Sequence, residues 1–137
     1  MIALDTSALL RHLLDDHPEM ARQVTRMLEG PETVCVSVSV LIEALHVLRG
    51  SPYGKSNPDV ADALVELLGH ENVVLVDLEA DLASAAIAAV RHLSPRHIAD
   101  ALISAAARQA GARQLVTADR TSASRLVPVV QLDDLIA

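Results

Sequence analysis

Four carboxylate residues lie in stretches that are otherwise apolar, and their chemistry makes them the first candidates for a functional site: Asp5, Glu43, Asp100 and Asp119. Asp5 is the only charged residue among the first ten, and it directly follows the apolar run of residues 1–4. Such a run predicts a short buried strand, and open α/β sheets bind ligands at the carboxyl ends of their strands. Taken alone, Asp5 is explained equally well as a turn or helix-capping residue.

Glu43 is the only acidic residue in the apolar segment 38–48, which is predicted to be a largely buried helix. A lone buried carboxylate is costly, so it should be paired, protonated or bound to a metal ion. The alternative is that Glu43 points outward at the edge of a sheet. Both interpretations stay open at this point.

Asp100 and Asp119 each have a structural explanation as well as a functional one. Asp100 falls in a predicted helix over residues 97–110, where Asp competes for backbone hydrogen bonds. A place near the helix amino terminus, beside the helix dipole, would explain it without any function. Asp119 follows a predicted strand over residues 114–117, and a helix N-cap is the simpler interpretation for it alone.

Together the four acids favour a metal site. The strands before Asp5 and Asp119 are candidates for neighbours in a parallel sheet, with the helices of Glu43 and Asp100 beside them. If the four converge, their charges repel, so some stay protonated or a hard cation binds. Oxygen ligands of this kind select Mg²⁺ or Mn²⁺ over zinc. Such ions support hydrolysis of phosphodiester bonds.

The elements that must position these acids alternate between strand and helix. Strands are predicted at 1–4, 33–36, 72–76, 114–117 and 127–130, and helices at 19–28, 38–48, 57–69, 79–92 and 97–110, after a first short helix beginning near residue 8. Ser37 or Ser39 can cap the second of these helices, and Asn57 with Pro58 can start the third. The pattern predicts one α/β domain over residues 1–137, with a mainly parallel central sheet flanked by helices. Residues 49–58, rich in Gly and Pro, are expected to be a mobile surface loop.

The composition narrows the function classes. The chain has 137 residues with no Phe, no Trp and one Tyr, which excludes an aromatic stacking platform for single-stranded nucleic acid. The net charge of −7 argues against a broadly basic phosphate-binding surface, although bound divalent cations can supply positive charge. A single cysteine, Cys35, fits a reducing cytoplasm. The absence of a signal peptide and of a membrane-spanning run predicts a soluble protein inside the cell, with no membrane partner.

The sequence lacks the motifs that would indicate a zinc site, a glycine-rich phosphate loop or a reactive cysteine. The six histidines show no close zinc-ligand spacing, and no glycine-rich phosphate loop is present. Cys35 has no obvious activating base in the sequence. The arginines, ten of the eleven cationic residues, are uninformative because they serve exposed ion pairs as readily as phosphates.

Four segments carry a resemblance to a known family. They are Leu4-Asp5-Thr6-Ser7-Ala8-Leu9-Leu10, Glu43 in the apolar helix, Ile98 to Ala107 around Asp100, and Leu115-Val116-Thr117-Ala118-Asp119. In their order and spacing they resemble the PIN-domain ribonucleases, in particular the VapC-type toxins of bacterial toxin–antitoxin pairs. The set spans essentially the whole chain, and its specificity comes from the four motifs in this order.

The resemblance implies a PIN fold and a Mg²⁺- or Mn²⁺-dependent endoribonuclease. Asp5 and Asp100 would be the principal metal ligands, while Glu43 and Asp119 would complete the site or position water. Ser7 and Thr117 would be supporting hydroxyl groups. The resemblance also implies a homodimer that is inhibited by a cognate antitoxin protein covering the active site. The sequence departs from the family pattern after Asp119, where Arg120 stands in place of a frequent aromatic residue, which puts the local geometry of that acid in question.

Three other functions compete with an RNA-cleaving nuclease. A receiver-like signalling domain would also bind Mg²⁺, but it needs a paired acid after the first strand and a late lysine, whereas Thr6 follows Asp5 and Lys55 is the only lysine. A phosphatase of the two-aspartate type fails because Ser7 stands where its second Asp belongs. A catalytically idle PIN-fold binding module is the remaining alternative. The sequence does not specify the RNA target, the antitoxin, the number of metal ions or the role of the 49–58 loop.

Overall fold

Helices and short strands alternate along the chain, as the sequence pattern predicts. The computed structural model describes residues 1–14, 16–121, 124 and 126–135. In chain order its elements are β1 (Ile2–Ala3), α1 (Thr6–Leu14), α2 (Pro18–Glu29), β2 (Val34–Val36), α3 (Val38–Arg49), α4 (Asn57–Leu68), β3 (Val73–Leu75), α5 (Ala80–Ala89), α6 (Pro95–Gln109), β4 (Leu115–Thr117), β5 (Val129–Gln131) and α7 (Leu132–Leu135). The α/β class is confirmed. The short helix α7 was not predicted from the sequence.

The strands form two sheets in which every pair is parallel. The first sheet has the order β1-β2-β3, with Ala3 opposite Cys35 and Cys35 opposite Val74. The second sheet contains β4 and β5. The parallel arrangement is therefore as predicted, but in the described part of the chain the strands are divided between two sheets and not joined in one central sheet.

The hydrophobic core lies between the first sheet and the helices that follow its strands. Its largest fully buried side chains include Leu41, Leu45, Leu64 and Leu102, all of them from helices. Leucine suits this role because it has a high helix propensity and a large apolar side chain. In the helical layer α3 packs against α1, α4 and α6, while α5 packs against α4 and α6. A core built from aliphatic side chains is what the composition requires.

Two helix starts show how local sequence sets the fold. Ser37 caps α3, as predicted, because its hydroxyl oxygen accepts a hydrogen bond from the backbone N–H of Val40. The predicted cap of α4 is wrong by one residue, because Ser56 accepts from the backbone N–H of Asp59. Asn57 instead lies inside α4, is buried, and donates from Nδ2 to the carbonyl of Arg91 at 3.1 Å. The amide thereby ties the start of α4 to the end of α5.

The predicted surface loop between α3 and α4 is confirmed in position. Its residues 51–56 are exposed, and the side chain of Arg49 donates to the carbonyl of Lys55 across it. The backbone N–H groups of Tyr53 and Gly54 both donate to the carbonyl of Gly50. The predicted mobility of this loop stays a prediction.

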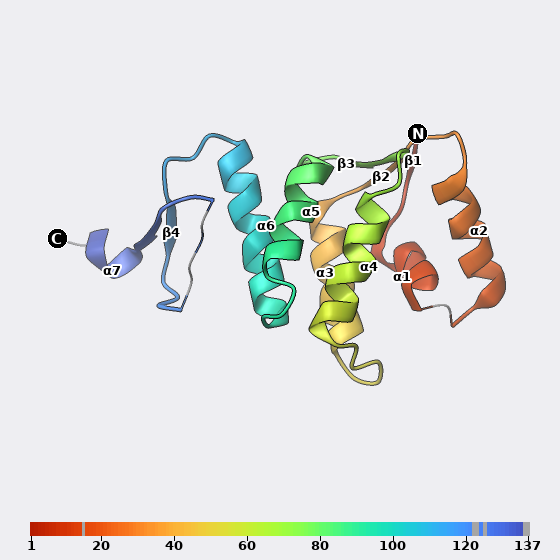
Figure 1. Ribbon diagram of the computed structural model, residues 1–137, viewed down its shortest axis with the longest axis horizontal. Coiled ribbons are helices and arrows are strands. Elements are labelled where there is room, and N and C mark those ends of the chain that lie inside the picture. Colours follow the sequence, from red (N-terminus) through yellow and green to blue (C-terminus); the bar gives the residue numbers. More distant parts are fainter. Residues whose placement is uncertain (15, 122–123, 125, 136–137) are drawn as a thin grey trace.

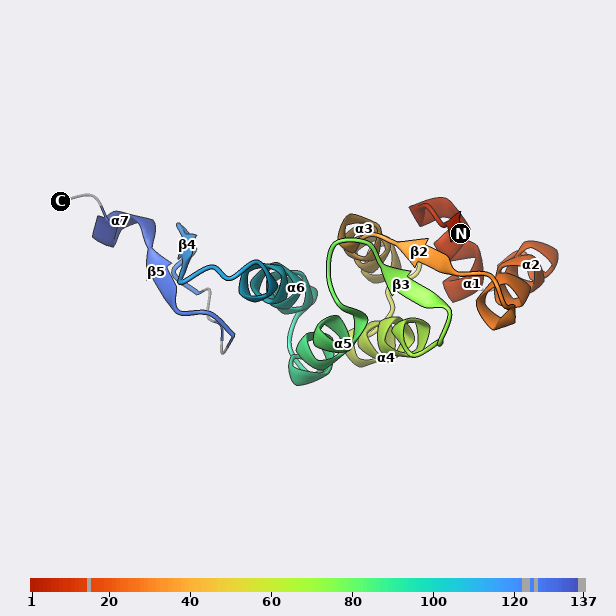
Figure 2. The ribbon, with the colours of Figure 1, turned by 90° about the horizontal axis from the view of Figure 1, so that it is seen from above.

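The second sheet lies at one end of the molecule. We call β4, β5 and α7 the C-terminal unit, and β1 to α6 the N-terminal body. In both views α6 stands between the C-terminal unit and the first sheet (Figure 1, Figure 2). The helix α6 ends at Gln109, and in the turn that follows Gly111 has a φ of 82° and the N–H of Ala112 donates to the carbonyl of Ala107. This helix end sets the direction in which the chain leaves the body. Over the described residues, no helix is long and apolar enough to cross a membrane.

Candidate active site

Asp5 lies two residues after the end of β1, on the carboxyl side of the strand, as predicted from the sequence. Its Oδ1 accepts hydrogen bonds from the backbone N–H of Ala8, at 2.9 Å, and from the hydroxyl of Ser7, at 2.8 Å. These bonds hold the pKa of Asp5 below its ordinary value, with the backbone N–H of Ala8 the larger cause. The residue is exposed. Asp5 is therefore an ionised carboxylate that a solute can reach, and Ser7 contacts it directly.

Glu43 lies on the exposed face of α3, together with Ser39, His46 and Val47. Of the two interpretations that the sequence left open, the outward-pointing one is observed, because the buried stripe of this helix runs through other positions. Its Oε2 accepts a hydrogen bond of 2.5 Å from the hydroxyl of Thr6. Since Thr6 directly follows Asp5, this bond brings the second predicted acid to the start of α1, beside the first.

Asp100 is half-buried on α6, a helix that turns Ile98 and Leu102 into the core. The helix α3, which carries Glu43, packs against α6. The two helices that carry Glu43 and Asp100 are therefore neighbours. Among the described residues, however, no hydrogen bond or ion pair joins Asp100 to another of the four acids.

Asp119 follows β4 in a tight turn and does not cap a helix, because the next element described after it is the strand β5 and not a helix. Its Oδ1 accepts from both the backbone N–H and the hydroxyl of Thr121, at 2.9 and 2.8 Å. Its Oδ2 accepts from Arg96 on α6. These contacts, with the backbone N–H of Thr121 first, lower the pKa of Asp119. The hydroxyl of Thr117 accepts from the N–H of Asp119 at 3.0 Å, which agrees with a supporting position.

The four acids do not converge within one chain, which corrects the expectation from the sequence. In the part of the chain that the structure describes, no three His, Cys, Asp or Glu side chains are placed to hold one metal ion. The physical reason is the divided sheet. Because β4 pairs with β5 and not with β1, Asp119 stays with the C-terminal unit while Asp5 stays with the body. The carboxylate oxygens fit Mg²⁺ or Mn²⁺ chemically, but their arrangement in this chain does not complete a site.

Four side chains that bond the predicted acids were not singled out from the sequence. Thr6 bonds Glu43, the hydroxyl of Thr121 and the guanidinium of Arg96 bond Asp119, and Gln131 donates from Nε2 to the carbonyl of Asp119 at 3.1 Å. The sequence does contain a cue for Thr6, because it directly follows the first acid and threonine is common at helix amino termini. No sequence cue points to Arg96 or Gln131, because each is distant in sequence from the acid that it contacts.

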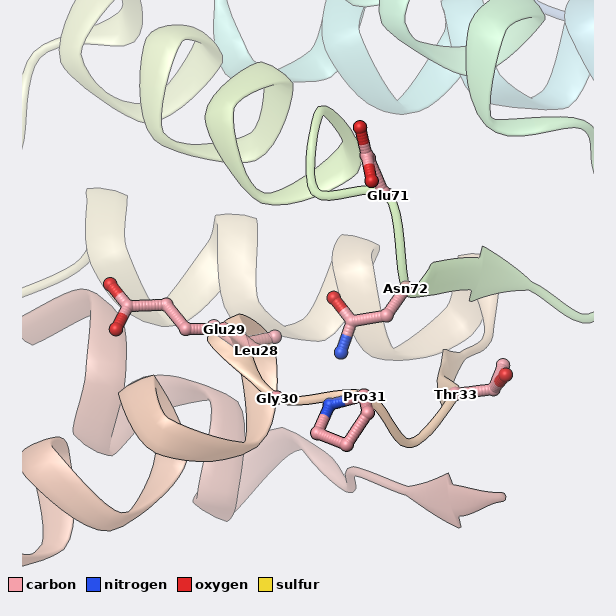
Figure 3. A pocket seen from close by; sticks show the side chains of 7 residues that line it. All are labelled: Leu28, Glu29, Gly30, Pro31, Thr33, Glu71 and Asn72. Carbon is pink, nitrogen blue, oxygen red and sulfur yellow. The ribbon is translucent and has the colours of Figure 1, made fainter.

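A hollow of about 480 Å³ lies elsewhere, at the amino ends of β2 and β3 (Figure 3). Thr33 and Asn72, which precede these two strands, line it together with Leu28, Glu29, Gly30, Pro31 and Glu71. The side chain of Asn72 donates to the carbonyls of Met27 and Glu32 at 2.9 Å, so it closes a turn. In Figure 3 the carboxylates of Glu29 and Glu71 point away from each other. None of the four candidate acids lines this hollow, so it is separate from the candidate site.

Comparison with family models assigns the chain to a protein family. The model described as "PIN domain" matches residues 2–126, a range that includes all four candidate acids. The chain belongs to the PIN domain family. PIN domains are generally nucleases, many of them metal-dependent ribonucleases, and they usually use divalent metal ions. No curated protein sequence matches this PIN domain at a significant level.

Proposed function

We propose that this PIN domain is a metal-dependent endoribonuclease that hydrolyses RNA phosphodiester bonds with Mg²⁺ or Mn²⁺. The observation that carries the proposal is the family match over residues 2–126, within which Asp5, Glu43, Asp100 and Asp119 stand in the order of the family's acidic motifs. Carboxylates that share one or two hard cations are a common arrangement for cleaving phosphodiesters.

The local geometry around the first two acids supports this proposal. Asp5 is held ionised by the N–H of Ala8 and the hydroxyl of Ser7, and it remains exposed. Thr6 fixes Glu43 next to it. Two oriented, accessible carboxylates suit a polymeric substrate, which reaches an open surface more easily than an enclosed cavity. A divalent ion bound there would supply the positive charge that a chain with a net charge of −7 lacks.

We further propose that the nuclease is the toxin of a bacterial toxin–antitoxin pair. The support is the resemblance of the four motif segments to VapC-type toxins. In this role the protein would act in the cytoplasm as a homodimer, and a cognate antitoxin protein would block RNA by covering Asp5 and Glu43. The exposure of both carboxylates makes that kind of inhibition feasible.

The deciding experiment is incubation of total cellular RNA with the purified protein in Mg²⁺, in Mn²⁺ and in EDTA. We expect cutting with either ion and none in EDTA. Asp5→Asn keeps the shape of the side chain but removes its charge, so we expect at least a hundredfold loss of cleavage. Asp81→Asn is the matched control, because Asp81 is an equally exposed acid in the first turn of α5 and outside the set.

Two results would reject the proposal. Cleavage that Asp5→Asn leaves unchanged would mean that the acid set does not perform the reaction. Absence of cleavage, together with metal binding that is equal in the wild type and in Asp5→Asn, would favour the idle binding module. Circular dichroism of both variants checks that the fold is retained.

A further inference from the structure

The loop between α3 and α4, residues 50–56, contains the only tyrosine and the only lysine of the chain, Tyr53 and Lys55. Because the chain has no Phe and no Trp, Tyr53 is also its only large aromatic ring. Both side chains are exposed, Tyr53 to 39 %, and among the described residues no ion pair joins Lys55 to an acid. A ring that can stack on a base and a free positive charge therefore stand two positions apart on one surface loop.

Hydrogen bonds give this loop a defined shape. The backbone N–H groups of Tyr53 and Gly54 both donate to the carbonyl of Gly50, at 3.0 and 2.9 Å. The side chain of Arg49 donates to the carbonyl of Lys55 and so closes the loop from the other side. Gly54 has a φ of 53°, a left-handed conformation that glycine adopts without strain, and it turns the chain between the two exposed side chains. A ring held on a closed turn loses less freedom on binding than one on an unbonded loop.

The exposed face of α3 leads from a candidate acid to this loop. Glu43, His46 and Val47 are all exposed, and the helix ends at Arg49, where the loop begins. The six residues from Glu43 to Arg49 correspond to about 9 Å along the helix axis. A strand of RNA that is bound at Glu43 and follows this face therefore reaches the loop within a few nucleotides.

The end of the loop lies beside the link between α5 and α6, which is rich in arginine. Asn57, directly after the loop, donates from Nδ2 to the carbonyl of Arg91 at 3.1 Å, and Figure 1 shows both connections at the lower end of the helices. Residues 82–118 include four arginines and a single acid, Asp100, although the whole chain has a net charge of −7. Arg91 pairs with Asp62, but such an exposed pair is weak and screened by solvent. The loop therefore borders a stretch whose charge suits phosphate groups.

We propose that the loop between α3 and α4 is an RNA-binding site, in which Tyr53 stacks on one unpaired base and Lys55 binds a phosphate of the same strand. Base stacking on a single ring tolerates any sequence, so the loop selects unpaired RNA and not a particular base. The composition excludes a run of stacking rings, which leaves the rest of the affinity to phosphate contacts and makes it salt-dependent. The loop contacts the substrate away from the reacting bond. Its role in substrate binding rests on the proposed nuclease function, but the RNA contact itself does not.

Intrinsic fluorescence tests the contact directly, because Tyr53 is the only tyrosine and no tryptophan is present. The Asp5→Asn protein, in which we expect cleavage to be lost, is titrated in Mg²⁺ with a short single-stranded RNA of mixed sequence. We expect saturable quenching of the tyrosine that follows the binding curve measured by anisotropy of labelled RNA. The same titration of N-acetyltyrosinamide corrects for light that the bases absorb.

Substitutions separate stacking from charge. Tyr53→Leu keeps an apolar side chain without the ring and should weaken RNA binding by about five- to 150-fold, whereas Tyr53→Phe should bind like the wild type. Lys55→Gln should reduce the slope of log affinity against log salt by about 0.7, the value for one phosphate of a single strand. Arg22→Gln, at an exposed cation on α2, is the matched control and should leave that slope unchanged. Circular dichroism checks that each variant is folded.

Three results would overturn the RNA-binding loop: no RNA binding, binding that leaves the fluorescence of Tyr53 unchanged, or wild-type affinity in the Tyr53→Leu protein. Cleavage assays keep this proposal apart from the nuclease function. If RNA quenches Tyr53 but the wild-type protein never cuts RNA, the nuclease function fails while the loop site stands. If the wild type cuts RNA and Tyr53→Leu leaves KM unchanged, the loop site fails while the nuclease stands. Where both hold, Tyr53→Leu should raise KM with little change in kcat, because the ring lies away from the reacting bond.

Discussion

The N-terminal body and the C-terminal unit use the same strand direction but differ sharply in burial. The body contains the continuous aliphatic core, whose members run from Leu4 to Ala105. Beyond α6, Val127 is the one fully buried apolar residue among those described. Burial of apolar surface is the main favourable contribution to folding, so most of this contribution comes from the body and little of it from the unit. The fold of the body is therefore stabilised by its own core, whereas the unit has little buried core of its own.

The two regions are alike in how they hold their acids. Asp5 in the body and Asp119 in the unit each follow a parallel strand, and each accepts from a hydroxyl two residues later. Each also accepts from a nearby backbone N–H, and each has a lowered pKa. The difference lies in the neighbours. Thr6 links Asp5 to a second acid, Glu43, whereas Arg96 neutralises Asp119.

The largest expected effect is a difference between the two regions in how much free energy of unfolding is lost when a leucine is replaced by alanine. Leu45→Ala removes a fully buried side chain of α3 and should lower the free energy of unfolding by about 2–5 kcal/mol. Leu115→Ala in β4 removes the same atoms from a half-buried position, so a dilute sample should lose less than about 1 kcal/mol. Urea unfolding measures both losses. Equal losses for the two variants would contradict the contrast.

A smaller contrast is expected for two side-chain amides that bond backbone carbonyls. Asn57 is 7 % exposed, and its Nδ2 satisfies the carbonyl of Arg91. Asn57→Ala should cost about 1–3 kcal/mol. We expect the lower value, because the buried Oδ1 of Asn57 has no hydrogen-bond partner among the described residues, so its removal breaks no bond there. Gln131→Ala in the unit leaves a half-buried carbonyl that water can reach, and should cost roughly 0.5 kcal/mol. Thermal unfolding compares the two, and a larger loss at Gln131 would show that the unit is better ordered than its burial suggests.

The sequence predicted the body better than the unit, for physical reasons. Apolar periodicity and short-range caps located β1 to α6 closely, because the core imposes that periodicity on each element. Ser37 as a helix cap and the strand-end position of Asp5 followed from neighbouring residues alone. The separation of β4 from β1 could not be predicted, since strand order depends on contacts between residues distant in the chain. For the same reason the sequence left open whether Glu43 is buried, and the pairing of Arg96 with Asp119 was missed.

The smallest expected effect concerns the two turns that hold Asp5 and Asp119. Ser7→Ala and Thr121→Val each remove the hydroxyl donor and leave the backbone N–H bonds in place. The pKa of the adjacent carboxylate should rise only part of the way to its ordinary value, because the backbone N–H is the larger cause in both turns. A lowered pKa in the folded state stabilises the protein above the unfolded value of about 3.9, and this contribution is lost as the pH falls through the folded pKa. Each variant should therefore lose that contribution at a higher pH than the wild type. Carboxyl-carbon NMR titration follows the two aspartates separately. A shift of Asp5 in the Thr121→Val protein would contradict the separation of the two regions, in which β4 pairs with β5 and not with β1.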